Sequence, residues 1–448
     1  MGKPSFSISG LRGIVNQDLY PEYITEVSAG FGAFLGGGKV AIGQDCRLSS
    51  EMFFHAVTAG LLSAGCEVVN LGVCPTPTVL LNVKHLVLSG GIIITASHNP
   101  EEWNGLKFVS KEGIFLTENE IKEFKQLLKS KNIKRADLLE IKNIKDEPEA
   151  IDNHIKKILR SEFFRDIPVK KYVVGIDACN GAASAAVSSL LQTLGSTPVN
   201  FFCDTVQPGK FPRSPEPRAE NLEGLSNFVK EKKLDFGLAF DPDGDRVSFV
   251  DETGFALGEE ATLLLALTFI LKKKTGPVVI NLSTSQAIDD IAAKFSVPVY
   301  RTKVGEAAVV AKMKEVNAVI GGEGNGGVIL PEVNFTRDGI TGTAILIHLL
   351  SDREIPLSEI SKELPKYFMQ KSVLPYQVKE WDNKKSKLKK AFMPANFIKQ
   401  DGLKIIGKDY WVHIRPSNTE PIIRLIAESK FQKYTSELID KVNRIFVE

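Results

Sequence analysis

The chain has few cysteines, almost no excess of charge and no long apolar segment, and each shortage excludes a class of protein. The five cysteines are odd in number and lack CxxC spacing, which predicts reduced, mostly buried thiols in a cytoplasmic protein. The net charge of +2 gives no electrostatic basis for binding nucleic acid or a membrane surface. No segment approaches the length of a membrane span, and residues 1–7 lack the apolar region of a secretion signal.

What remains is an ordinary globular composition, with 43% hydrophobic and 25% charged residues. The 448 residues are too many for one hydrophobic core and predict three or four domains. One pattern occurs three times, in which a β-rich run, a small-residue turn, a helical stretch and a second β-rich run succeed one another. The three units span residues 39–71, 171–201 and 277–301.

The predicted fold class is therefore α/β, with three successive mixed-sheet domains of related topology. After about residue 365 the pattern changes to strands and a last helix, which predicts a smaller C-terminal α+β domain. The expected domains are residues 1–150, 151–253, 254–368 and 369–448. Segment 129–150 is charged and contains Pro148, which suits a linker or a terminal helix.

Ser97 is the first candidate functional residue, because it follows a buried strand and lies in a tight Asn-Pro turn. A serine is a poor nucleophile unless a base or a metal activates it. His98 is adjacent and Lys107 follows shortly. A capping serine beside a surface histidine fits this motif equally well.

Asp241, Asp243 and Asp245 follow another predicted strand at alternate positions, so an extended loop would point them to the same side. Three converging carboxylates repel one another without a cation, and Mg²⁺ is the hard oxygen-seeking ion expected first. Arg246 could steady a phosphate or these carboxylates. An EF-hand is excluded because its sixth position, which requires glycine, is Arg246. A phosphatase with Asp241 as nucleophile stays open.

The glycine-rich segment 322–327 matches a dinucleotide-binding fingerprint formally, but a strand follows it where a helix is required. We therefore predict a flexible loop whose backbone can approach a ligand. Its polar side chains are Glu323 and Asn325, a carboxylate and an amide that suit two sugar hydroxyls.

Arg415 ends a predicted strand at a turn rich in hydroxyl and amide groups, which predicts a phosphate site. Arg424 could add a second guanidinium group. The turn residues that would surround the anion are Ser417, Asn418 and Thr419.

In this order the four motifs resemble those of the α-D-phosphohexomutase superfamily, the group of phosphoglucomutases, phosphomannomutases and phosphoglucosamine mutases. The resemblance covers essentially the whole chain, from residues 10–13 to the turn after Arg415. It implies four domains around a central cleft, with Ser97 carrying a phosphoryl group. It also implies one Mg²⁺ held by that phosphate and the three aspartates, and a hexose 1,6-bisphosphate as intermediate and activator.

The resemblance also implies roles for single residues. Glu323 and Asn325 would hold sugar hydroxyls, with Lys303 nearby. Arg12, His98 and Lys107 would lie at the reacting centre, and Lys107 is our choice for proton transfer. The phosphate that does not react would be bound by Arg415, Ser417, Asn418, Thr419 and Arg424.

Many glucose and mannose enzymes of the superfamily have a serine and a histidine where this chain has Asn325 and Gly327. The chain thus resembles a subgroup assigned as phosphoglucosamine mutases or broad phosphogluco/phosphomannomutases. We expect a monomer or homodimer acting on a hexose or hexosamine phosphate. Two alternatives stay open: an aspartyl-nucleophile sugar phosphatase that uses Asp241, and a non-catalytic phosphosugar-binding protein.

Overall fold

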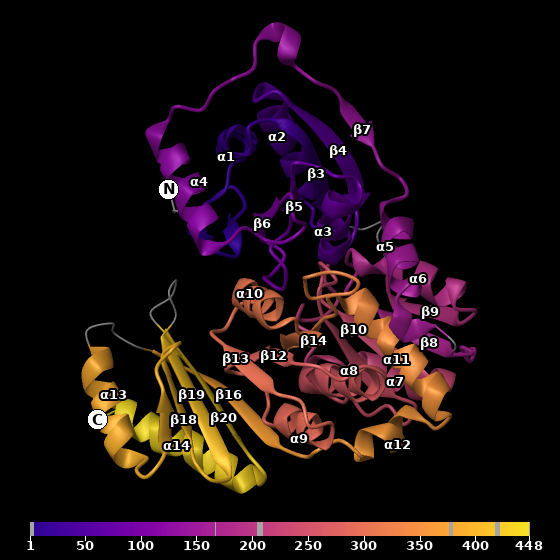
Figure 1. Cartoon of the computed structure of the whole chain (residues 1–448), viewed down its shortest axis with the longest axis vertical. Coiled ribbons are helices and arrows are strands. Elements are labelled where there is room, and N and C mark those ends of the chain that lie inside the picture. The colour runs from indigo at the N-terminus through magenta and orange to yellow at the C-terminus, as the bar shows by residue number, and fades with distance from the viewer. Residues whose placement is uncertain (1–3, 166, 204–208, 376–379, 417–421, 448) are drawn as a thin grey trace.

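The computed structural model describes residues 4–165, 167–203, 209–375, 380–416 and 422–447. Four β-sheets follow one another along these residues (Figure 1). The first three sheets are mixed and are each packed with helices, whereas the fourth is antiparallel throughout. The predicted fold class is confirmed.

The first domain has a seven-stranded sheet in the order β1-β2-β6-β5-β3-β4-β7. Its strands are β1 (Ser5–Ser7), β2 (Gly10–Ile14), β3 (Gly38–Gln44), β4 (Cys66–Val73), β5 (Gly90–Ile94), β6 (Trp103–Ser110) and β7 (Ile144–Asp146). Its helices are α1 (Pro21–Leu35), α2 (Ser50–Ser63), α3 (Thr76–His85), α4 (Glu118–Ser130) and the short η1 (Leu138–Glu140). All of β5 is buried, as its continuous apolar run predicts for a central strand.

The second and third domains have four-stranded sheets in the orders β11-β10-β8-β9 and β15-β14-β12-β13. The second comprises α5 (Ala150–Leu159), η2 (Glu162–Phe164), β8 (Val173–Asp177), α6 (Ala183–Thr193), β9 (Thr197–Phe202), η3 (Ala219–Asn221), α7 (Glu223–Lys232), β10 (Phe236–Phe240) and β11 (Val247–Asp251). The third comprises α8 (Glu259–Lys273), β12 (Val278–Asn281), α9 (Ala287–Lys294), β13 (Val299–Thr302), α10 (Glu306–Val316), β14 (Ile320–Glu323), β15 (Gly327–Ile329), α11 (Gly339–Arg353) and α12 (Leu357–Lys362).

The same four-strand order, β6-β5-β3-β4, forms the centre of the first sheet, so the three repeated units of the sequence share one topology. In each case two parallel strands flank the first strand of the unit, and an antiparallel strand completes one side. Because parallel strands end at a common edge, the loops after β3 and β5, and those after β8 and β10, meet at the carboxyl edges of their sheets.

The fourth domain is an antiparallel sheet in the order β16-β20-β19-β18-β17 with two helices. Its elements are β16 (Phe368–Pro375), α13 (Trp381–Ala391), β17 (Asn396–Ile398), β18 (Leu403–Ile406), β19 (Tyr410–Pro416), β20 (Ile422–Ser429) and α14 (Gln432–Val447). Its buried side chains form a cluster of their own.

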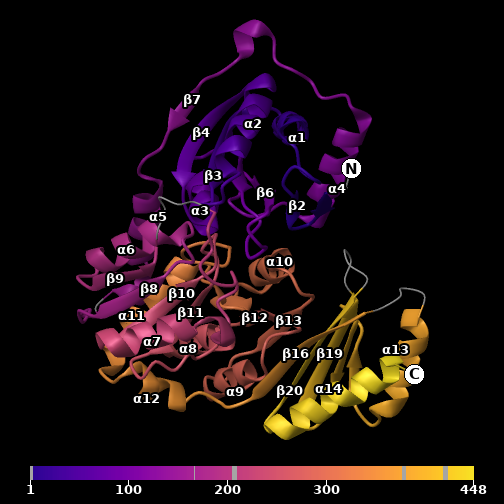
Figure 2. The same ribbon diagram turned by 180° about the vertical axis from the view of Figure 1, so that it is seen from behind.

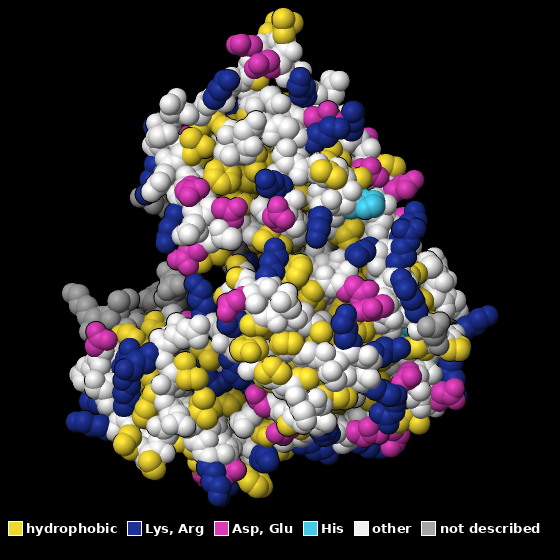
Figure 3. All heavy atoms as spheres, viewed as in Figure 1, with side chains coloured by type: hydrophobic (Ala, Val, Ile, Leu, Met, Phe, Trp, Pro, Cys, Tyr) yellow, Lys and Arg dark blue, Asp and Glu magenta, His cyan; other side chains and the backbone are white. Residues whose placement is uncertain are grey.

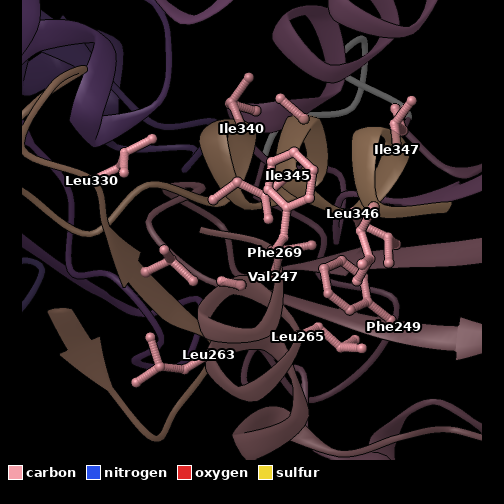
Figure 4. Close-up of a cluster of buried hydrophobic side chains, with 14 of the residues drawn as sticks. Val247, Phe249, Leu263, Leu265, Phe269, Leu330, Ile340, Ile345, Leu346 and Ile347 are labelled. Carbon is pink, nitrogen blue, oxygen red and sulfur yellow. The ribbon is translucent and has the colours of Figure 1, made fainter. Parts of the chain in front are cut away.

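The second and third domains, in contrast, share one core. Val247 and Phe249 of β11 pack with Phe269 of α8 and Ile345 of α11 in a single buried cluster (Figure 4). Two sheets that bury one continuous apolar cluster form a rigid base, on which the loops after β10 and β14 have fixed relative positions.

Two local expectations are corrected. Segment 129–150 is neither a plain linker nor a helix, because β7 within it pairs in parallel with β4 at the edge of the first sheet. The whole stretch from α4 to α5 passes around the outside of that domain (Figure 2). Segment 322–327 is not a flexible loop but the tight connection of the β14–β15 hairpin, in which Glu323 pairs with Gly327.

The thiols match the prediction, since all five cysteines are free, four are buried and Cys203 is half-buried. Among the described residues, no helix combines the length and the apolar character that crossing a bilayer requires. On the face shown in Figure 3 the surface is hollowed between the first domain and the fourth.

Candidate active site

Ser97 lies directly after β5 in a left-handed backbone conformation, with a φ of 54° that residues other than glycine rarely adopt. Its N–H donates to Thr95 Oγ1 over 2.8 Å, and the Thr95 hydroxyl donates to Asp45 Oδ2 over 2.6 Å. Strain of this kind persists only where surrounding contacts hold it. The hydroxyl of Ser97 is therefore held in a fixed, buried position at the strand end.

Arg47 is the main support of this serine turn, although the sequence analysis did not single it out. Its side chain is buried, forms an ion pair with Asp45 at 3.0 Å, and donates to four backbone carbonyls of the turn and its flank. The acceptors are the carbonyl oxygens of Ser97 and Asn99 at 2.7 Å, Pro100 at 2.5 Å and Trp103 at 2.9 Å. Asp45 and Arg47 follow β3, the parallel neighbour of β5, and that position was the available signal.

His98 connects the serine to the second domain. Its Nδ1 lies 3.3 Å from Ser97 Oγ and accepts a hydrogen bond from Arg246 Nη2 at 3.1 Å. Because a guanidinium group only donates, Nδ1 carries no proton and Nε2 does, 3.6 Å from Glu216. Burial and the charges of Arg246 and Arg12 lower the pKa of His98 well below its ordinary value. The imidazole is thus neutral at pH 7, and Ser97 Oγ and Arg246 Nη2 both lie close to the single lone pair of its Nδ1.

Asp241, Asp243 and Asp245 are the only group of potential metal ligands found within the described part of the chain, with carboxylate oxygens within 4.8 Å of one another. One oxygen of each accepts a hydrogen bond: Asp241 from the N–H of Arg246, Asp243 from Lys107 and Asp245 from Arg337. The other oxygen of each is buried without a hydrogen-bond partner among the described residues, and Arg246 Nε lies 3.6 Å from that of Asp241 and 3.5 Å from that of Asp245. Each of the three carboxylates thus has one oxygen that makes no hydrogen bond. Such a group of oxygens suits Mg²⁺, as the sequence predicted for these aspartates.

The charges around this triad support the same conclusion. Burial first, and then the carboxylates of Asp245 and Asp243, raise the pKa of Asp241 well above its ordinary value, so this site opposes a third negative charge unless a cation is bound. Lys107 Nζ lies 2.6 Å from Asp243 and 3.4 Å from Asp245. Burial opposes its charge, but the two carboxylates outweigh burial and raise the pKa of Lys107. The lysine of the first domain is thus a fixed cation against the aspartates of the second.

The first and second domains also meet through Thr76, which begins α3. Its N–H donates to the carbonyl of Asp243 over 2.8 Å, and its hydroxyl donates to Oδ2 of the same residue over 2.7 Å. This contact fixes the metal loop relative to the sheet that holds Ser97.

Glu323, at the end of β14, is buried and already held on both oxygens. Oε1 accepts from Asn281 Nδ2 at 2.7 Å and from the N–H of Gly305 at 3.0 Å, and Oε2 accepts from Arg337 at 3.1 Å. Asn325 is half-buried and its Oδ1 is buried without a partner. A carboxylate in a rigid setting beside an unsatisfied amide oxygen fits recognition of sugar hydroxyls.

Two predicted residues lie at the margins of this group. Arg12 donates to Asn99 Oδ1 over 3.0 Å, so it contacts the serine turn. Lys303 is exposed and its ammonium group lies 3.0 Å from Glu118 of α4. In this conformation Lys303 bridges the third and first domains.

In the fourth domain Arg415 and Arg424 face each other across β19 and β20. Arg415 lies 3.7 Å from Asp401, and burial is the main cause of the lowered pKa of its guanidinium group. Two facing cations repel unless an anion lies between them. Ser417, Asn418 and Thr419 lie outside the described residues.

Family models cover most of the chain. Those for α/β/α domains I, II and III and for the C-terminal domain of phosphoglucomutase/phosphomannomutase match residues 3–134, 152–254, 258–368 and 376–445. The chain belongs to the phosphoglucomutase/phosphomannomutase family. As a member of this phosphohexomutase family it is an intramolecular phosphotransferase, as the motifs predicted.

Similar phosphohexomutases match over nearly their whole length. A phosphoglucomutase/phosphomannomutase of Thermococcus kodakarensis is 37% identical, over 98% of this chain and 97% of the relative. A phosphoglucosamine/phosphogalactosamine mutase of Sulfurisphaera tokodaii is 33% identical, over 99% of each chain. The crystal structure of a family protein from Burkholderia thailandensis superimposes with a TM-score of 0.86 at 26% identity, over 98% of this chain and 96% of that one.

Proposed function

We propose that this phosphohexomutase interconverts the 1-phosphate and 6-phosphate of a hexose or hexosamine through a phosphoserine at Ser97 and a 1,6-bisphosphate intermediate. One observation supports this most: a chain of contacts leads from Ser97 Oγ through His98 and Arg246 to Asp241, across two domains. A hydroxyl that can carry a phosphoryl group thus lies beside carboxylates suited to a divalent cation.

In this proposal each of the four domains, divided at residues 150, 253 and 368, contributes one loop. Asp241, Asp243 and Asp245 would hold Mg²⁺, which when bound neutralises phosphoryl oxygens. Lys107, Arg12 and Arg246 are positioned to neutralise the remaining charge. Phosphoryl transfer depends on such preset cations more than on covalent help from other groups.

The chemical step is an exchange of one phosphorus–oxygen bond. A hydroxyl oxygen of the sugar bonds to the phosphorus on Ser97, the bond from phosphorus to Ser97 Oγ breaks, and the hydroxyl proton leaves the sugar. Lys107 remains our candidate for moving protons in this step: as a cation it would give one proton to Ser97 Oγ as the bond to phosphorus breaks, and it would take the hydroxyl proton of the sugar in return. In the second half-reaction the other phosphate of the bisphosphate returns to Ser97, which restores the enzyme, so no phosphate is lost overall.

The identity of the sugar is proposed from the polar residues of the β14–β15 hairpin and from the substrates for which the relatives are named. Glu323 and Asn325 would hold two hydroxyls, Lys303 would approach the sugar after domain movement, and Arg415 and Arg424 would bind the idle phosphate with Ser417, Asn418 and Thr419. The relatives are named for glucose, mannose, glucosamine and galactosamine phosphates. We propose either glucosamine phosphate or glucose/mannose phosphate as the substrate.

The decisive test is turnover of glucosamine 1-phosphate, glucose 1-phosphate and mannose 1-phosphate with Mg²⁺ and a trace of the matching 1,6-bisphosphate. Wild type is compared with Ser97→Ala. Conversion to the 6-phosphate that disappears in the variant supports the proposal and ranks the sugars. Release of free phosphate that survives in Ser97→Ala but not in Asp241→Asn would establish the aspartyl phosphatase instead.

A further inference from the structure

Arg337 joins three carboxylates that come from three different parts of the chain. Its Nη2 lies 2.7 Å from Asp245 Oδ2 in the metal loop, and its Nη1 lies 3.1 Å from Glu323 Oε2 in the sugar-binding hairpin. Its Nε lies 2.9 Å from Glu306 Oε2 at the start of α10. The side chain is only 10% exposed. One planar guanidinium group therefore sets the relative position of two loops from different domains.

The backbone that carries Arg337 is itself anchored. The next residue, Asp338, caps α11 by accepting from the N–H groups of Ile340 and Thr341. Its other oxygen lies 2.7 Å from His154 Nε2, and its N–H donates to the carbonyl of Val328. Since these groups are buried, the guanidinium group is held from a fixed base.

Gly327 is explained by the same arginine. Its φ lies outside the left-handed region, so the backbone alone does not require glycine. A Cβ at this position would lie 2.3 Å from Cδ and 2.8 Å from Cγ of Arg337, both far inside contact distance. The methylene stem of Arg337 (Cβ to Cδ) thus occupies the space that a side chain at position 327 would need.

We propose that Arg337 is a positioning residue for the phosphosugar reaction. It holds Glu323 and Asp245 at a fixed position relative to each other, and its methylene stem fills the space beside Gly327. The inference rests on the proposed function for its substrate. With Oδ2 of Asp245 bound to Arg337, Oδ1 of that carboxylate makes no hydrogen bond to the described residues and has Arg246 Nε nearby, at 3.5 Å. With Oε2 of Glu323 bound, the sugar-binding carboxylate cannot rotate away.

The first test measures binding rather than turnover. Glucose 6-phosphate and glucosamine 6-phosphate are titrated calorimetrically into Ser97→Ala protein in EDTA, with and without Arg337→Met or Arg337→Lys. Methionine keeps the packing of the stem but loses the hydrogen bonds, so the affinity should fall roughly tenfold or more, and lysine should restore part of it. The control is Arg353→Met at the other end of α11, whose partner is Glu363. It should stay within about twofold of its parent. Equal affinity in Arg337→Met and its parent would overturn the proposal.

The second test needs no ligand. The melting temperature is measured for wild type, Gly327→Ala, Arg337→Ala and the double variant. Alanine at 327 should lower it only while the stem of Arg337 is present, so the double variant should melt no lower than Arg337→Ala alone. Independent, additive losses would show that the two positions do not compete for space, and would overturn the proposal even if no sugar phosphate binds.

The two proposals fail separately. If wild type does not isomerise the sugar phosphates, or if Ser97→Ala still does, the mutase mechanism is refuted. The melting temperatures of the variants at positions 327 and 337 still test whether these two residues compete for space. Normal isomerisation together with unchanged binding in Arg337→Met refutes the role of Arg337 alone.

Discussion

Lys107 Nζ lies 2.6 Å from Asp243 Oδ2, so β6, the strand after the serine turn in the first domain, carries a cation that contacts the metal loop of the second. Replacing it by methionine should destabilise the metal-free protein by about 3 kcal/mol, because the buried Asp243 loses its nearest cation and Asp245 keeps only its arginine partners. Mg²⁺ should raise the melting temperature of Lys107→Met more than that of wild type, since the ion then supplies the missing charge.

Melting curves in EDTA and in Mg²⁺ test this, with Lys111→Met as the control. Lys111 is exposed and follows the same strand. An equal shift by Mg²⁺ in Lys107→Met and wild type would contradict the view that lysine and ion neutralise the same carboxylates.

Arg47→Lys should impair the serine turn while leaving the fold intact. A lysine keeps the charge beside Asp45 but cannot reach four carbonyls, so buried acceptors lose their donors at a cost of about 2 kcal/mol. We expect kcat to fall at least tenfold, because Ser97 Oγ is no longer held at the strand end. Steady-state kinetics measures this, with Arg353→Lys as the matched control. Unchanged kcat would show that the left-handed conformation of Ser97 does not depend on Arg47.

Arg415→Gln should weaken binding of the phosphate group. The variant removes one of two facing guanidinium groups, so affinity for glucose 6-phosphate should fall roughly tenfold to a hundredfold. Without ligand the variant should lose little stability, because the ion pair that Arg415 forms with Asp401 is long, at 3.7 Å, and partly exposed. Calorimetry on metal-free Ser97→Ala protein measures the affinity. Arg444→Gln on α14 serves as the control, and equal affinities in the two variants would count against a phosphate site on β19.

His413 should make stability depend on pH. It lies between the third and fourth domains, with Nδ1 2.8 Å from Ser283 Oγ and Nε2 2.7 Å from the carbonyl of Asp401. Burial lowers its pKa from 6.5 to about 4. The unfolded chain therefore binds a proton first as the pH falls, so this contribution is complete at pH 7 and is lost between about pH 6.5 and 4, by about 3 kcal/mol.

The measurement for this prediction is the melting temperature of wild type and His413→Gln at pH 7.5, 5.5 and 4.5. The advantage of wild type should shrink as the pH falls, whereas the exposed His55→Gln should follow wild type throughout. A constant difference in melting temperature between wild type and His413→Gln would contradict the prediction, because it would mean that folding does not change the pKa of this histidine.

The local sequence determines much of this protein. The apolar runs before Ser97 and before Asp241 specify central strands, because residues buried on both faces of a sheet must be apolar. The three aspartates do converge, but through a tight turn in which the N–H of Gly244 donates to the carbonyl of Asp241, and not through the extended loop that their alternation predicted. The repeated units share a strand order because the same pattern of strands and helices packs in the same way. Ser97 and the three aspartates were therefore identifiable before any contact was known.

The tertiary structure alone decided which charged side chains contact these groups. Arg47 is marked in the sequence only by its place after a strand, and Glu216 and Arg337 by no pattern, since a charged residue that becomes buried has the same sequence neighbours as an exposed one. Their roles follow from contacts across 50, 30 and 92 residues, with Ser97, Arg246 and Asp245 respectively. The glycine at 327 also became interpretable only when the stem of Arg337 was seen in the space of its missing side chain. Sequence patterns report which groups a strand end presents, whereas charge compensation and volume depend on parts of the chain that meet only in the folded state.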